Sequence, residues 1–140
     1  MTVHDKVHAM QPTVLVVDDE ELLRRFMAQA MSADGYRVLE ASNGIEALGW
    51  FGNGASPIHL VISDILMPGM GGVELAEQLA TRSPSPPVLF VTGGHGHSAL
   101  PGPVLLKPFL RSDLSTLVRQ LLDARTARFA RRSAPPEVTC

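Results

Sequence analysis

The stretch Val14-Leu15-Val16-Val17-Asp18-Asp19-Glu20 decides the fold of this chain. Four consecutive apolar residues are typical of a strand that is buried on both faces, as in a parallel sheet. The pattern returns in Leu60-Val61-Ile62-Ser63-Asp64, and a third apolar run, Val104-Leu105-Leu106, leads into Lys107-Pro108. The carboxyl ends of the strands in an open parallel sheet meet at one crevice. The sequence therefore predicts that acidic side chains and one ammonium group converge there.

The segments between these runs carry apolar residues at the spacing of amphipathic helices. Strands are predicted over 13–17, 36–41, 58–63, 87–92 and 104–106, and helices over 20–33, 43–51, 73–81 and from a cap at Ser112 onward. The segment 93–103 holds four glycines and two prolines, so it has room for only one or two helical turns. Alternating strands and helices indicate a doubly wound α/β domain with five parallel strands.

The length of 140 residues suits one domain. We expect a flexible leader over 1–12, the domain over 13–123 and a disordered basic tail over 124–140. The net charge of −2 gives no overall attraction to nucleic acid or to a membrane surface. No apolar run is long enough to cross a bilayer, and we recognise no signal peptide. The only cysteine, Cys140, permits no internal disulfide, so we expect a soluble cytoplasmic protein.

The predicted crevice would gather Asp18, Asp19 and Asp64. Two unit charges about 4 Å apart repel by roughly 4 kcal/mol at an effective dielectric constant of about 20. A cation would relieve this repulsion, and carboxylate oxygens suit Mg²⁺. Each residue alone has an ordinary explanation, because acids favour helix amino termini, aspartate before a Pro/Gly loop forms turns, and most lysines, such as Lys107, are on the surface. Their combination favours a site.

In order and spacing, these residues resemble the receiver domains of two-component response regulators. The resemblance spans residues 13–122 and rests on Asp18-Asp19, on Asp64 followed by Met67-Pro68-Gly69, on Thr92 and on Lys107-Pro108-Phe109. It implies the flavodoxin-like strand order 2-1-3-4-5, with the switch point between the first and third strands. The glycine-rich segment indicates that the fourth helix of the family is short or missing here.

The resemblance also implies the chemistry. Asp64 would accept a phosphoryl group from a phosphohistidine on a histidine kinase or a histidine phosphotransfer protein. Lys107 would pair with the phosphoryl oxygens, and Thr92 would follow the new charge. Asp19, Asp64 and the backbone carbonyl of Leu66 would hold Mg²⁺, with Asp18 reaching it through water. Such a chain is a signalling domain rather than an enzyme, and its output is a changed protein–protein interaction.

The sequence departs from the family in places. Val104 occupies a position where the family carries an aromatic residue. With its short segment in place of the fourth helix, the chain resembles the receivers of hybrid histidine kinases. Alternatives are a pseudo-receiver scaffold that is never phosphorylated and a detached receiver of a hybrid kinase. A Mg²⁺-dependent phosphatase would carry a second acid at position 66, which is leucine. His95 and His97 form a His-x-His, but no further Cys or His supports a metal site there.

Overall fold

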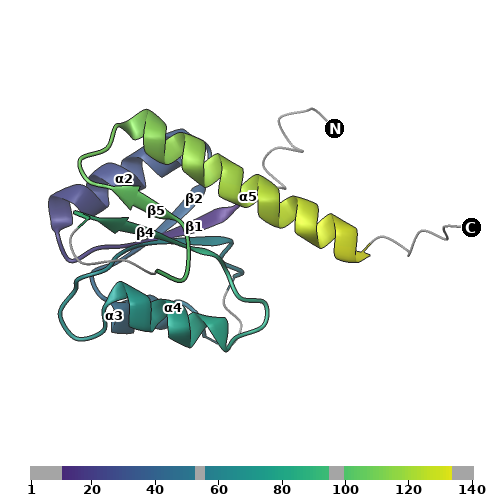
Figure 1. Ribbon diagram of the computed structural model, residues 1–140, viewed down its shortest axis with the longest axis horizontal. Helices are drawn as coiled ribbons and strands as arrows, with labels where there is room; N and C mark the ends of the chain where they lie inside the picture. The colour runs from purple at the N-terminus through teal and green to yellow at the C-terminus, as the bar shows by residue number, and fades with distance from the viewer. Residues whose placement is uncertain (1–10, 53–55, 95–99, 134–140) are drawn as a thin grey trace, which may run out of the picture.

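The computed structural model describes residues 11–52, 56–94 and 100–133. Five parallel strands form one sheet in the order β2-β1-β3-β4-β5. They are β1 (Thr13–Val17), β2 (Arg37–Ala41), β3 (Leu60–Asp64), β4 (Val88–Thr92) and β5 (Val104–Leu106). Helices α2 (Glu21–Ala33) and α5 (Arg111–Ser133) cover one face, and α3 (Gly44–Leu48) and α4 (Gly72–Ala80) cover the other (Figure 1). The predicted doubly wound sheet and its order 2-1-3-4-5 are confirmed.

The central strands are buried because helices cover both of their faces. Within β1, Val14 and Val16 pack into the core under α2 and α5, whereas Leu15 and Val17 pack into the core over α3 and α4. All five residues of β1 and of β4 are buried, which explains why these strands read as unbroken apolar runs. Burial of each large apolar side chain contributes about 1.5–3 kcal/mol, so this sheet supplies much of the stability.

Helix starts depend on short-range hydrogen bonds. The Asn43 side chain accepts a 2.8 Å bond from the Glu46 N–H, which caps α3. The predicted cap of the last helix is wrong, because α5 begins at Arg111 and the Leu110 N–H donates to the Asp113 carboxylate at 3.0 Å. Helix α3 ends at Leu48, three residues before the predicted end, and β3 begins two residues later than predicted.

The expected disordered tail needs a correction. Helix α5 continues to Ser133, so residues 124–133 are helical and α5 projects beyond the sheet (Figure 1). The physical reason is composition: this stretch is rich in alanine and arginine, which favour helix, and the first proline comes at Pro135. The last residues, 134–140, and most of the predicted leader, 1–10, lie outside the described residues.

The connection from β4 to β5 matches the expectation of a short or missing fourth helix. Its described residues, 93–94 and 100–103, contain no helix, while 95–99, with His95 and His97, lie outside the described residues. In the parts of the chain that the structure describes, no helix is both long and apolar enough to cross a membrane.

Gly72 provides a test of how tightly α4 is seated against β3. A Cβ at Gly72 would clash with the Asp64 backbone oxygen and lie 3.0 Å from Ser63 Oγ. We expect Gly72→Ala to lower the free energy of unfolding by about 1–3 kcal/mol in urea titrations, as overpacking does. Gly52→Ala is the matched control because a Cβ there meets nothing within 4 Å. Equal stability of the two variants would contradict the close packing of α4.

Candidate functional site

The structure brings together the three predicted carboxylates at the carboxyl end of the sheet. Asp18 and Asp19 directly follow β1, and Asp64 is the last residue of the neighbouring strand β3. Val17 pairs with Ser63, so the two strands end at the same level and their aspartates lie close together. One carboxylate oxygen from each aspartate lies within 4.8 Å of the other two. Adjacent parallel strands that both end in aspartate therefore create a concentrated negative charge.

Asp18 is the buried member of this cluster. Its side chain has no exposed surface, and Oδ1 accepts a 2.9 Å hydrogen bond from the Glu20 N–H. Its other oxygen, Oδ2, is buried without a hydrogen-bond partner among the described residues. Burial raises the pKa of Asp18 to about 6, the nearby Asp64 charge adds to this, and the Glu20 bond and the Lys107 charge oppose it.

The donor set fits Mg²⁺. A buried carboxylate oxygen without a partner is costly, and a cation would satisfy it. The surrounding ligand atoms are carboxylate oxygens, which are the ligands that this hard ion accepts. Asp18, Asp19 and Asp64 are therefore the residues that could hold the ion.

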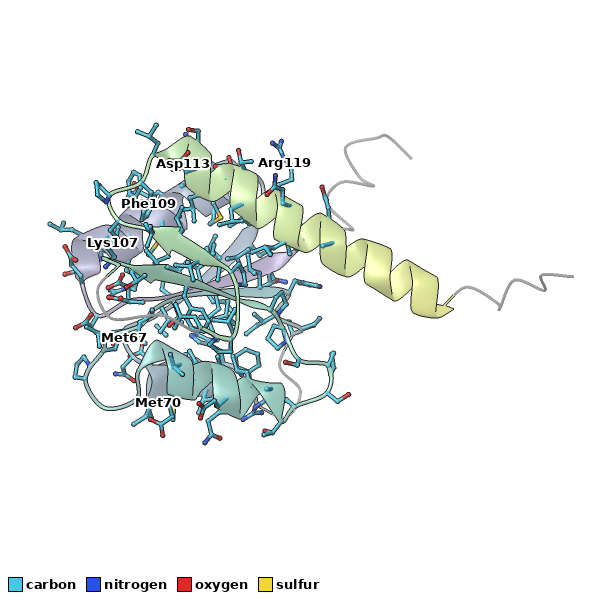
Figure 2. The ribbon with its side chains drawn as sticks, in the orientation of Figure 1. Met67, Met70, Lys107, Phe109, Asp113 and Arg119 are labelled. Atoms are coloured by element: carbon cyan, nitrogen blue, oxygen red, sulfur yellow. The ribbon has the colours of Figure 1, made fainter. Side chains whose placement is uncertain are left out.

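Asp64 and Lys107 face each other across the end of the sheet. Asp64 Oδ1 accepts a 2.7 Å hydrogen bond from the Ile65 N–H, and Oδ2 lies 3.5 Å from Lys107 Nζ. The Asp64 side chain is 14% exposed, so one carboxylate oxygen is fixed while the group stays partly open to solvent. Figure 2 shows Lys107 at the same end of the domain as Met67, which belongs to the loop after β3. The spacing of β5 and the Lys-Pro pair predicts this placement correctly.

The remaining predicted residues lie around this pair. Thr92 ends β4 and is buried, and its Oγ1 accepts a 3.3 Å hydrogen bond from the Gly94 N–H. The Lys107 N–H donates to the Thr92 backbone oxygen at 2.8 Å, which joins the ends of β4 and β5. Leu66 follows Asp64 by two residues and its side chain is exposed. The roles assigned to Thr92 and to the Leu66 carbonyl stay predictions.

Residues that the sequence did not reveal support the site. Ser63 Oγ donates to the Asp64 backbone oxygen at 2.8 Å, and the Gly72 N–H donates to the Ile65 oxygen at 2.9 Å. The Arg24 guanidinium donates to the Asp18 backbone oxygen at 3.1 Å. The Gly71-Gly72 pair could have indicated the contact with Ile65 from sequence, because adjacent glycines often mark places where two backbone segments approach closely. Arg24 gave none, since its other partner, Glu40, lies 16 residues away on β2.

Comparison with known proteins identifies the family. The family model of the response regulator receiver domain matches residues 14–119. This chain belongs to that family. The receiver is 34% identical over 119 residues to the sensor kinase CckA of Brucella abortus, a match that covers 79% of this chain but only 12% of the kinase. It is 31% identical over 118 residues to the response regulator receiver protein CpdR of the same organism, covering 79% of this chain and 97% of CpdR.

Solved structures agree with this assignment. The receiver domain of the hybrid histidine kinase CckA shares 35% identity with this receiver, with a TM-score of 0.69, and the match covers 79% of this chain and 98% of that one. The response regulator TrrA of Thermotoga maritima, crystallised in complex with Mg(2+)-BeF, shares 31% identity with a TM-score of 0.71, covering 79% and 99%. The predicted resemblance to receivers of hybrid kinases is confirmed.

The buried Asp18 predicts a pH dependence of stability in the metal-free receiver. Its pKa rises from 3.8 to about 6 on folding, so the folded state binds more protons between these values and stability falls as pH rises through them. The loss is about 3 kcal/mol at pH 7 relative to a pH below 3.8. Asp18→Asn removes this titration.

We therefore expect Asp18→Asn to be more stable than the wild type at pH 7 in EDTA, and this advantage to disappear near pH 4. Urea unfolding at both pH values measures the two differences. An advantage of equal size at both pH values would show that the charge of Asp18 is not its cause.

Proposed function

We propose that this receiver accepts a phosphoryl group on Asp64 from a phosphohistidine of a histidine kinase or a histidine phosphotransfer protein, in a Mg²⁺-dependent reaction in the cytoplasm. The observation that carries the proposal is the position of Asp64 Oδ2, which lies 3.5 Å from the Lys107 ammonium while Oδ1 is held by the Ile65 N–H. Oδ2 is thus not held by the backbone and would act as the nucleophile, with a cation beside it.

The chain's own groups suit this reaction. Asp64 Oδ2 would form the new O–P bond while the P–N bond of the phosphohistidine breaks and the imidazole nitrogen keeps the electron pair. The Lys107 ammonium would balance the negative charge of the phosphoryl oxygens. Bound Mg²⁺, held by Asp18, Asp19, Asp64 and the Leu66 carbonyl, would supply further positive charge to the same oxygens. The Thr92 hydroxyl would afterwards donate a hydrogen bond to a phosphoryl oxygen.

The receiver would signal by changing a protein–protein interaction. Thr92 directly precedes the segment 93–103. A shift of its hydroxyl toward the phosphoryl group would therefore change the conformation of that segment first. Val104, 37% exposed on β5, is too small to act as the aromatic residue usual in the family. An unphosphorylated scaffold is disfavoured by the complete set of acids together with the Lys107 ammonium beside Asp64.

Phosphorylation tests the assigned acceptor. Incubation with acetyl phosphate and Mg²⁺ should label the wild-type chain, and Asp64→Ala should reduce labelling to background, because it removes the attacking oxygen. Phosphate-affinity gels and mass spectrometry measure the label. Glu77→Gln, which removes an exposed acid of α4, is the control and should be labelled as the wild type is. Labelling of Asp64→Ala at the wild-type level would place the acceptor elsewhere.

Lys107 and Asp19 should have separable roles. Asp19→Asn removes an anionic ligand and should weaken Mg²⁺ binding by about tenfold or more, because few charged ligands remain for an ion that loses its waters reluctantly. Lys107→Ala removes a competing positive charge, so it should leave Mg²⁺ affinity equal or higher while it slows phosphorylation. Calorimetric titration with Mg²⁺ measures the affinities. Equal weakening by both substitutions would contradict this division.

A further inference from the structure

Arg24, the fourth residue of α2, connects the acidic loop to the edge strand β2. Its Nη1 donates a 3.1 Å hydrogen bond to the backbone oxygen of Asp18, and its Nε donates a 3.1 Å bond to Glu40 Oε1. The Arg24 N–H also donates to the Glu20 oxygen at 2.9 Å. The side chain is only 16% exposed, so the guanidinium lies between the loop and the strand rather than in solvent.

The oxygen that Arg24 holds belongs to the peptide that joins Asp18 to Asp19. A peptide unit is planar and turns as one body, so holding its oxygen sets the direction in which the chain enters Asp19. Asp18 has its own restraints, which are burial and the bond from Glu20. Asp19 is exposed, and no hydrogen bond from the described residues reaches its carboxylate. The position of the Asp19 carboxylate therefore depends on the backbone that Arg24 fixes.

Electrostatics makes this restraint necessary. The three carboxylates repel one another, and exposed Asp19 is the one free to swing away. Glu40 contributes by fixing the plane of the guanidinium at Nε, so that Nη1 points at the Asp18 oxygen. A lysine could not replace this arrangement, because its ammonium is a single point donor without a planar fork.

We propose that Arg24, oriented by Glu40, is a positioning residue that holds the Asp18–Asp19 peptide so that the Asp19 carboxylate is preorganised for Mg²⁺. This inference rests on the metal dependence in the proposed function and adds two residues that do not themselves contact the ion. Supports of this kind typically affect metal affinity by about 10- to 100-fold.

The neighbouring arginine supplies a matched control. Arg25 pairs with Glu21 one helical turn away, with Arg25 Nη2 3.3 Å from Glu21 Oε1 and both side chains largely exposed. Arg24→Ala and Arg25→Ala therefore remove the same side chain from adjacent positions of α2, but only the first releases the Asp18 oxygen.

Calorimetric titration of the full chain with Mg²⁺ and, separately, with Ca²⁺ tests the proposal. Arg24→Ala should raise the Mg²⁺ Kd by about tenfold. It should raise the Ca²⁺ Kd much less, because Ca²⁺ accepts irregular ligand geometry and Mg²⁺ requires a nearly ideal octahedron. Arg25→Ala removes the same charge from an exposed position, so it should leave both Kd values unchanged or slightly lower. Loss of positive charge alone would tighten the binding of both cations, so weaker Mg²⁺ binding has the opposite sign to a simple charge effect.

Urea titrations in EDTA show whether Arg24→Ala is stably folded. If it is not, Glu40 supplies an independent pair of variants. Glu40→Ala should weaken Mg²⁺ binding in the same direction but less, whereas Glu40→Gln keeps an oxygen acceptor for Arg24 Nε and should stay near the wild type. An unchanged Mg²⁺ Kd in both Arg24→Ala and Glu40→Ala, or equal losses for Mg²⁺ and Ca²⁺, would overturn the positioning role.

The two proposals can fail separately. If the wild-type chain is phosphorylated on Asp64 while Arg24→Ala keeps its Mg²⁺ affinity, the positioning role is wrong and the proposed function stands. If the wild-type chain binds no Mg²⁺, both are wrong. If Mg²⁺ binding depends on Arg24 but Asp64 is not labelled, the positioning role stands and the phosphoacceptor assignment fails.

Discussion

Repulsion among the carboxylates of Asp18, Asp19 and Asp64 is the constraint on which the rest of the structure depends. The chain places three acids whose oxygens lie within 4.8 Å of one another and buries one of them completely. Folding therefore works against its own electrostatics at this end of the sheet. Any cation that binds only the folded state raises the free energy of unfolding and offsets part of this repulsion. Ion binding and folding are therefore thermodynamically linked.

The surroundings of the cluster can be understood as a frame that withstands this repulsion. The buried strands β1 and β3 fix the positions from which the aspartates leave the sheet, because their register pairs Val17 with Ser63. Backbone N–H groups hold one oxygen of Asp18 and one of Asp64, so neither carboxylate can turn freely. Lys107 is the only side-chain cation that contacts an acidic side chain of the cluster within the described residues. The frame leaves Asp18 Oδ2 without a partner among the described residues and leaves Asp64 Oδ2 with only the 3.5 Å contact to Lys107.

Much of this arrangement could be predicted from sequence because it depends on local patterns. The apolar runs before Asp18 and Asp64 identify central strands, and the Lys-Pro pair after β5 places Lys107 at the same edge. What could not be predicted depends on tertiary contacts or on weak local preferences. Arg24 meets its partner Glu40 only because β2 lies beside β1. The predicted domain ended at residue 123, whereas α5 continues to Ser133, because the alanines and arginines of this stretch favour helix.

The extended α5 gives the molecule an electrical polarity. Its projecting residues, 124–133, include arginines 125, 128, 131 and 132 and no acid, while the whole chain has a net charge of −2, so the remainder is net negative. The aspartate cluster lies at the carboxyl end of the sheet, and α5 projects from the opposite end (Figure 1). A receiver with its charges separated in this way would be turned by the field of a charged partner before contact, over distances that salt limits to about 8 Å at physiological ionic strength.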